Sequence, residues 1–265
     1  MKKTFLSDKT PIYCLIPSEA FILDDHIKGY LDHGISVKEN DIIIDVGANI
    51  GVLGIRLSKF FKSISIYSFE PIPEIFNVLK KNSQFSRNTN FKVYQKGIGE
   101  KLERKVFTYF PNSPALSTAE PEMWKENPKA FKNAVKGSIQ NAPKKFWWAK
   151  LIPSFFIPLI AKRLLKNSQQ ISCEIITLSH FIKEENIQKI NLLKIDCEGL
   201  EWNVLMGIKK SDWIKIESIV MEIHDIENRL QNTIRLLRKH GFKNIKTEKE
   251  KALNETKLIN LYATR

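Results

Sequence analysis

The chain has 265 residues, of which 43% are hydrophobic, and carries a formal net charge of +13. That length suits one large α/β domain, and the three cysteines (Cys14, Cys173 and Cys197) form no CxxC pair, which argues against a zinc knot or a disulfide framework. Charged residues interrupt the N-terminus before an apolar stretch develops, so we expect no secretion signal and a cytoplasmic protein.

Residues 1–40 are expected to form a lead-in to a single domain that spans 1–265. We predict a hairpin around Ile12–Leu23 and a helix near Asp25–His33. Beyond this lead-in, apolar runs alternate with segments of helical spacing, which is typical of an α/β fold with a mostly parallel sheet. The predicted strands are 41–45, 64–69, 91–96, 105–110, 171–178, 190–195 and 216–223, followed by an antiparallel pair at 242–247 and 257–263, and the main predicted helices are 52–61, 73–83, 200–207 and 227–240.

A glycine-rich turn, Asp45-Val-Gly47-Ala-Asn49-Ile-Gly51, follows the first core strand. Glycines allow the backbone of such a turn to approach a ligand closely. A dinucleotide site would have the pattern GxGxxG, and the carboxylate of Asp45 would repel a pyrophosphate. The turn instead suits a ligand with an ammonium group and no phosphate, such as the methionine end of S-adenosylmethionine (SAM). The sequence contains no GxxxxGKS or GxxxxGKT motif, so a P-loop is excluded.

The next strand ends in Glu70 and Pro71, about twenty residues after this turn. At that distance an acidic side chain reaches the ribose hydroxyls of a bound nucleoside. The turn and this carboxylate together predict an adenosine-containing cofactor.

Other core strands also end in polar residues. In a parallel sheet the carboxyl ends of the strands meet at one edge, where ligands bind. Five polar side chains are therefore expected to lie along that edge: Asp45, Glu70, Asp196, Glu198 and His224.

A basic and aromatic segment, about 119–170, interrupts the alternation of strands and helices. Ten of its residues between Lys125 and Lys166 are Lys or Arg and one is acidic. Its longest apolar run, Leu151–Ala161, is much shorter than the roughly twenty residues that span a bilayer. We favour a helical lid over an apolar acceptor that also attracts an anionic partner, either an acidic carrier protein or, through 144–166, a membrane surface. The alternative is a solvated excursion whose aromatic residues pack on the core.

Four ordered motifs resemble those of the FkbM-type methyltransferases: Asp45–Gly51, Phe69-Glu70-Pro71, Leu193–Glu201 and Met221–His224. The similarity covers roughly 41–120 and 171–225, and it implies a class I, Rossmann-like, SAM-dependent fold and methyl transfer to oxygen. It also implies that the first motif surrounds the methionine moiety, that Glu70 holds the ribose, and that the Gly97–Gly99 region lies near the adenine. The predicted cofactor-binding residues are Asp45, Gly47, Asn49, Gly51, Glu70, Pro71, Gly97, Ile98 and Asp196.

Methyl transfer to an oxygen needs an aligned acceptor and a group that removes its proton. His224 is the first candidate for the base, because the ordinary pKa of histidine is near neutrality. Glu222, two residues earlier on the same strand face, is expected to orient the imidazole. Asp196 could accept a proton, and so could Glu198, which is also expected to hold the substrate.

Two features of the predicted site stay open. Asp196, Glu198, Glu222 and His224 could instead form an oxygen-rich site for a divalent cation, although we favour metal-independent chemistry. Asn112 and Ser113, in a turn before the insertion, are expected to contact the substrate unless they serve as turn caps.

The favoured function is SAM-dependent methylation of a hydroxyl or carboxyl oxygen in a small or carrier-tethered natural-product intermediate. One alternative is methylation of a sugar hydroxyl in a glycan or glycolipid. Another is an RNA-binding or RNA-modifying protein that uses the basic segment. Nucleic acid is disfavoured because Asp196-Cys-Glu-Gly differs from the NPPY-type tetrad of many base-amino methyltransferases, and because the acidic strand ends would repel phosphates.

Overall fold

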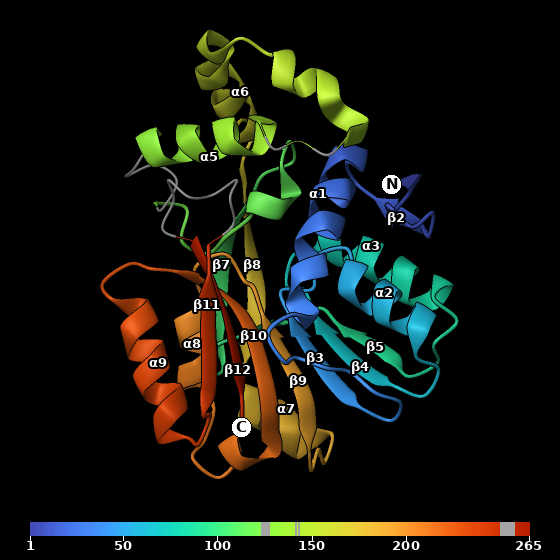
Figure 1. Ribbon diagram of the computed structural model, residues 1–265, viewed down its shortest axis with the longest axis vertical. Coiled ribbons are helices and arrows are strands. Elements are labelled where there is room, and N and C mark those ends of the chain that lie inside the picture. The colour runs from blue at the N-terminus through green and yellow to red at the C-terminus, as the bar shows by residue number, and fades with distance from the viewer. Residues whose placement is uncertain (123–127, 141, 143, 250–257) are drawn as a thin grey trace.

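The computed structural model describes residues 1–122, 128–140, 142, 144–249 and 258–265 (Figure 1). The predicted basic and aromatic segment 119–170 therefore includes a few positions outside the described residues, as does the connection before the last strand.

The N-terminal region differs from its prediction. A hairpin forms earlier, from β1 (Lys2–Phe5) and β2 (Pro11–Cys14), and helix α1 (Pro17–Ile27) occupies most of the predicted hairpin. Proline is well tolerated in the first turn of a helix, and Ala20, Leu23 and Ile27 then recur at helical spacing and pack on the core. A short 3₁₀ turn, η1 (Lys28–Leu31), follows, so the predicted helix at 25–33 is also misplaced.

The central sheet has seven strands in the order β11-β12-β10-β9-β3-β4-β5. All neighbouring pairs are parallel except those made by β12, which runs antiparallel to both β10 and β11. This confirms the predicted α/β fold with an antiparallel C-terminal strand. The strands are β3 (Ile42–Val46), β4 (Ser65–Phe69), β5 (Phe91–Tyr94), β9 (Ile190–Ile195), β10 (Ile216–His224), β11 (Asn244–Glu248) and β12 (Leu258–Thr264).

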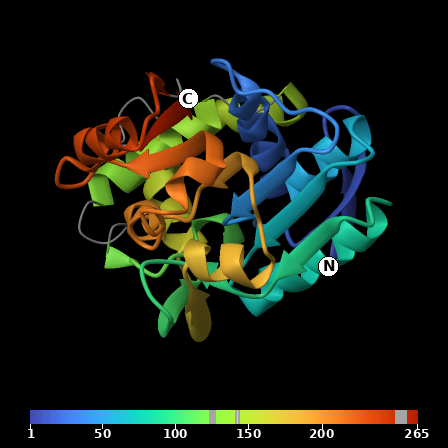
Figure 2. The ribbon, with the colours of Figure 1, turned by 90° about the horizontal axis from the view of Figure 1, so that it is seen from below.

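Helices cover both faces of this sheet. Successive strand residues point to opposite faces, so buried apolar residues in sequence must pack against helices on both sides. Ile43 and Ile44 are both fully buried, yet they belong to different apolar clusters. Figures 1 and 2 show α2 and α3 beside the β3–β5 half and α8 and α9 beside the other half. These helices are α2 (Val52–Phe60), α3 (Pro73–Phe85), α7 (Leu178–Glu184), α8 (Glu201–Met206) and α9 (Arg229–Lys239), with a 3₁₀ turn η5 (Trp213–Lys215) before β10.

The insertion starts and ends at a second, three-stranded sheet of order β6-β8-β7. β6 (Gly97–Ile98) and β7 (Glu103–Tyr109) both pair with β8 (Gln169–Ile176). Between β7 and β8, Figure 1 shows the helices at one end of the molecule, beyond the central sheet. They are η2 (Pro114–Leu116), α5 (Pro128–Gln140), η3 (Lys144–Leu151), η4 (Ser154–Phe156) and α6 (Ile157–Leu164).

Within the described ranges, the helices are all too short or too polar to cross a bilayer.

Candidate active site

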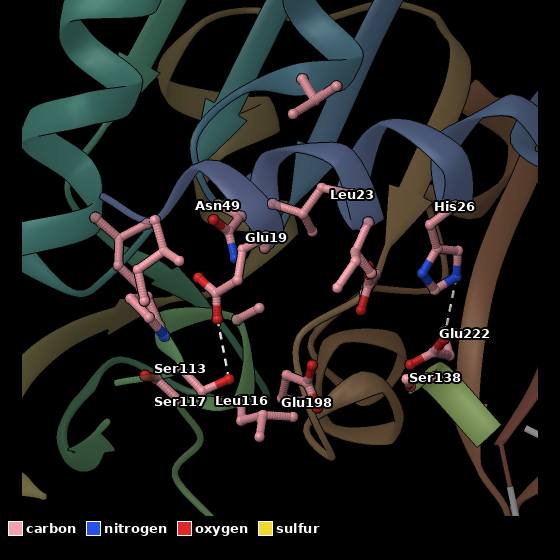
Figure 3. Close-up of a pocket in the computed structure, with 18 of the residues that line it drawn as sticks. Glu19, Leu23, His26, Asn49, Ser113, Leu116, Ser117, Ser138, Glu198 and Glu222 are labelled. Atoms are coloured by element: carbon pink, nitrogen blue, oxygen red, sulfur yellow. Dashed lines mark hydrogen bonds and ion pairs between the residues drawn. The ribbon is translucent and has the colours of Figure 1, made fainter. Parts of the chain in front are cut away.

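A cavity of about 1040 Å³ lies at the carboxyl ends of β3, β4, β9 and β10 (Figure 3). Helix α1 forms a second wall, and the insertion forms a third through α5, η3 and α6. The strand-end wall carries all five polar residues that the sequence predicted for this edge, and Asn49 and Glu222 join them; the five are Asp45, Glu70, Asp196, Glu198 and His224.

The glycines of the β3 turn are explained by packing within the chain. Gly47 has a positive φ of 73°, and a Cβ there would lie 1.8 Å from the carbonyl oxygen of Asp196. Gly51 lies outside the cavity wall, and a Cβ on it would come within 2.6 Å of Leu79 Cδ1. Close approach of the turn to the backbone of Asp196 requires glycine at position 47, and a positive φ of 83° favours glycine at position 51.

Lys194, which the sequence prediction missed, is the cationic centre of this wall. It is 4% exposed, and its Nζ lies 3.1 Å from Asp45 Oδ1 and 3.6 Å from Asp196 Oδ2. The ammonium also donates a 2.8 Å hydrogen bond to the carbonyl of Gly47. Burial opposes its charge, but the two carboxylates outweigh burial and raise the pKa of Lys194. Its sequence signal is a single charged residue in the otherwise uncharged strand Ile190–Ile195.

Several neighbouring groups stabilise the charged form of the Asp196 carboxyl group. The hydroxyl of Tyr30, in the turn η1 that follows α1, donates a 2.9 Å hydrogen bond to Asp196 Oδ2. Burial by itself would raise the pKa of Asp196, but Lys194 and His26 lower it below its ordinary value. Asp196 is therefore a poor proton acceptor at neutral pH.

Glu70 folds back on the glycine-rich turn. Its Oε2 accepts the N–H of Asn49 at 3.2 Å and its Oε1 accepts the N–H of Ile72 at 3.0 Å. Burial raises the pKa of Glu70 to about 7. Pro71 also lines the cavity, whereas Gly97 and Ile98 pair with β8 and lie outside the cavity wall.

His224 lies between two carboxylates. Its Nε2 is 3.6 Å from Glu198 Oε2, and its Nδ1 is 3.5 Å from Glu201 Oε2. Burial would lower the pKa of His224, but the carboxylates outweigh burial and raise it to about 10. The ring is therefore an imidazolium at neutral pH in this arrangement, not the neutral base that its ordinary pKa suggested.

Glu201 was missed as a partner of His224, although it belongs to the motif that ends β9. Its Oε1 accepts the N–H of Gly199 at 2.8 Å and so closes the turn that carries Glu198. Glu198 itself has a positive φ of 53° and lines the cavity.

Glu222 contacts a different histidine from the one expected. Its Oε2 lies 3.3 Å from Nε2 of His26, a residue of the second wall formed by α1 (Figure 3). The negative charge of Glu222 still contributes to the raised pKa of His224, but Glu201 lies against the His224 ring. The sequence prediction missed His26, because the pattern of residues does not show that this helix packs over the strand ends.

Asn112 and Ser113 both lie on the cavity wall, and both have partners within the chain. The amide of Asn112 donates to the carbonyls of Arg163 and Lys166, so it holds the end of α6. The hydroxyl of Ser113 donates at 2.9 Å to Oε1 of Glu19 on α1 (Figure 3). Burial raises the pKa of Glu19 to about 7.

The four residues considered for a metal site contact different partners. Asp196 lies near Lys194, Glu198 lies near His224, and Glu222 lies near His26. In the part of the chain that the structure describes, no three His, Cys, Asp or Glu side chains converge in a way that could hold a metal ion.

Apolar side chains of the insertion cover the side of the cavity opposite the sheet. Phe131 and Val135 of α5 line it and pack with Ile157 of α6, while Ile160 and Leu164 of α6 also face it. One wall is therefore charged and the facing wall is apolar, an arrangement suited to an amphipathic ligand.

Comparison with known proteins identifies the family through a sequence model. The family model "Methyltransferase FkbM domain" matches residues 45–243. The chain is 28% identical over 213 residues to the 31-O-demethyl-FK506 methyltransferase FkbM of Streptomyces tacrolimicus, covering 80% of this chain and 76% of that protein. It is 26% identical over 246 residues to Methyltransferase 1 of Beauveria bassiana, covering 91% and 89%. Fibrillarin of Aeropyrum pernix, solved with bound SAM, aligns with a TM-score of 0.45 and 13% identity over 90% of this chain and 72% of that one. The chain belongs to the FkbM-domain methyltransferase family.

Proposed function

We propose that this methyltransferase uses SAM to methylate a hydroxyl or carboxyl oxygen of a small or carrier-tethered natural-product intermediate. The observation that carries the proposal is the position of His224, held between Glu198 and Glu201 on the wall of the cavity that also contains Asp45 and Glu70. His224, the candidate for proton transfer, and the carboxylates Asp45 and Glu70, the candidates for cofactor binding, therefore line the same cavity.

The residues of the strand-end wall fit SAM. Its methionine end carries an ammonium and a carboxylate, and the wall offers carboxylates at Asp45 and Asp196 beside the ammonium of Lys194. Glu70 lies on the same wall and would accept hydrogen bonds from the ribose hydroxyls. When bound, SAM supplies an electrophilic methyl group on a positively charged sulfur.

His224 and Glu198 would act as a pair in removing the proton of the acceptor hydroxyl. At rest the imidazolium of His224 holds one proton beside the carboxylate. Burial raises the pKa of Glu198 well above its ordinary value, so this group binds a proton more tightly than an exposed glutamate, while the adjacent imidazolium of His224 favours its charged form. We expect it to accept the proton that the acceptor hydroxyl loses, while His224 fixes its position and balances its charge.

The apolar wall formed by α5 and α6 supports an acceptor with a sizeable apolar part. The name of the Streptomyces relative, a 31-O-demethyl-FK506 methyltransferase, supports oxygen as the methylated atom. The carboxylates of the opposite wall disfavour a nucleic acid, whose phosphates they would repel. We expect the reaction to take place in the cytoplasm.

The test is product analysis after incubation with SAM carrying a labelled methyl group. Hydroxylated and carboxylated acceptors, free, glycosylated and carrier-bound, are offered with and without Mg²⁺. Label recovered on oxygen supports the proposal, and mild alkaline hydrolysis separates methyl esters from ethers. Label transferred to nitrogen or carbon instead would contradict it.

A further inference from the structure

The insertion has a second apolar face, which lies outside the cavity wall except at Trp148. We call this the outer face, and its large apolar side chains are 42–73% exposed: Trp147, Trp148, Leu151, Phe155, Phe156 and Leu159. These six are among fifteen large hydrophobic residues exposed in the part of the chain described, and they fall within thirteen consecutive positions. Soluble proteins seldom expose so dense a group without a partner.

The outer face is distinct from the side that packs inward. Ile157 and Ala161 of α6 are buried against Phe131 and Val135. Leu159 is 64% exposed on the same helix. Helix α6 therefore has one apolar side that packs on the protein and another that the described residues do not cover. Figure 1 shows it at the end of the molecule farthest from the core sheet.

The exposed charges described within residues 147–166 all have one sign. Lys150, Lys162, Arg163 and Lys166 are all exposed there. From Asn127 to Lys166 the sequence contains no Asp or Glu. A partner that covers this surface should therefore combine negative charge with an apolar interior.

We propose that the outer face docks on an anionic phospholipid bilayer, with its aromatic and aliphatic side chains at the level of the headgroups and upper acyl chains. Tryptophan is favoured at that depth, and lysine and arginine are attracted to anionic headgroups. A second copy of the chain is disfavoured, because two surfaces of this charge would repel each other. An acidic protein fits less well, because the apolar side chains protrude from three short elements, η3, η4 and α6.

The outer face also adjoins the mouth of the cavity. Trp148 and Ile22 of α1 both line the cavity, and their side chains are 54% and 48% exposed. The ring of Phe21 on α1 packs edge-on against Phe146 of η3, which holds the two elements together at this point. A docked protein would therefore open its cavity toward the bilayer, and the acceptor would be an amphiphile or carry a lipid anchor. This last step rests on the proposed methyl transfer, whereas docking does not.

Flotation with lipid vesicles tests the docking. The full chain is mixed with vesicles of phosphatidylcholine alone or of phosphatidylcholine with phosphatidylglycerol, at low and high salt. We expect binding to the anionic vesicles that weakens as salt rises. The double variant Phe155→Ser, Leu159→Ser should weaken it at least about tenfold, and Lys162→Gln with Arg163→Gln roughly fivefold for each charge removed. Ile214→Ser, at a side chain 73% exposed on η5, and Lys209→Gln with Lys210→Gln are matched controls that should bind like the native chain.

The proposal is overturned if the native chain stays with neither type of vesicle, or if the outer-face variants bind as well as the controls. Retention of the chain by an acidic acyl carrier protein, without retention by vesicles, would likewise assign this surface to a protein partner. Binding is measured without turnover, so its failure would leave the proposed methyl transfer intact.

Discussion

The Nδ1 atom of His224 lies 3.5 Å from Oε2 of Glu201, whose other carboxyl oxygen closes the turn after β9. One side chain thus joins the end of β10 to the turn that carries Glu198. The position and the charge of the imidazole therefore depend on Glu201 as well as on the strand.

Replacing His224 with Asn should lower turnover by roughly 10²–10⁴-fold, because the proton-transfer pair loses one member. Affinity for S-adenosylhomocysteine should change little, since the cofactor-type ligands lie on other strands. Steady-state kinetics and calorimetric titration measure the two effects separately. Unchanged turnover would remove His224 from the mechanism.

Replacing Glu201 with Gln should lower the pKa of His224 from its raised value of about 10, because a neighbouring negative charge is lost. The expected fall is about one unit or more. Nuclear magnetic resonance of the ring protons follows this titration directly. Glu184→Gln, next to the exposed His180 on α7, is the matched control and should leave His224 unaffected. An unmoved titration in Glu201→Gln would mean that the contact does not set the charge of the ring.

Replacing Lys194 with Met should destabilise the protein by about 3–5 kcal/mol, because Asp45 and Asp196 would be left as buried, unbalanced carboxylates. Adding Asn at position 45 removes one of these charges and should recover part of the loss. Urea unfolding of the single and double variants measures the coupling. Purely additive losses would show that Lys194 and Asp45 do not compensate each other.

Glu19→Gln should stabilise the protein at alkaline but not at acidic pH. Burial raises the pKa of Glu19 from 4.5 to about 7, so the native state binds a proton that the unfolded chain releases in this range. The free energy of unfolding therefore falls as pH rises from about 4.5 to about 7. Above that range the buried carboxyl group is ionised and destabilises the native state fully. The amide avoids this cost, which predicts a gain of up to about 3 kcal/mol near pH 8 and almost none near pH 4. Thermal unfolding of both proteins across this range provides the comparison, and a gain that is constant with pH would contradict the prediction.

Phe131→Ala should raise the KM for the acceptor about tenfold or more while leaving cofactor affinity unchanged, because Phe131 lines the apolar wall of the cavity. Phe85→Ala, at an exposed position of α3, is the matched control. Equal KM values in the two variants would argue against acceptor binding at this wall.

The strand ends were predictable from the sequence because each follows a clear apolar run. Asp45, Asp196 and His224 could therefore be assigned to one edge from the sequence alone, and the structure brings them to one cavity. Their partners were harder to predict. Strand alternation places Glu222 and His224 on one face, but it does not indicate that α1 brings His26 against Glu222.

The misplaced N-terminal helix explains most of the other omissions. Glu19 lies on α1 in a region expected to form a hairpin, whereas His26 and Tyr30 lie in the region of the helix predicted near Asp25–His33, whose place over the sheet the sequence did not indicate. Long-range packing fixes this helix over the sheet, and local sequence pattern carries little information about such contacts. Lys194 had a visible signal, a charge within an apolar strand, but its role depends on two carboxylates that only the folded sheet brings near it.

The most direct test is calorimetric titration of the native chain with S-adenosylhomocysteine, repeated with Asp45→Asn. If the strand-end wall is the cofactor site, the native chain should bind with a dissociation constant on the order of 1 μM, and the variant should bind at least about tenfold more weakly while remaining folded. Absence of binding by the native chain would contradict the proposed use of this cavity, and equal binding by the variant would move the cofactor away from Asp45.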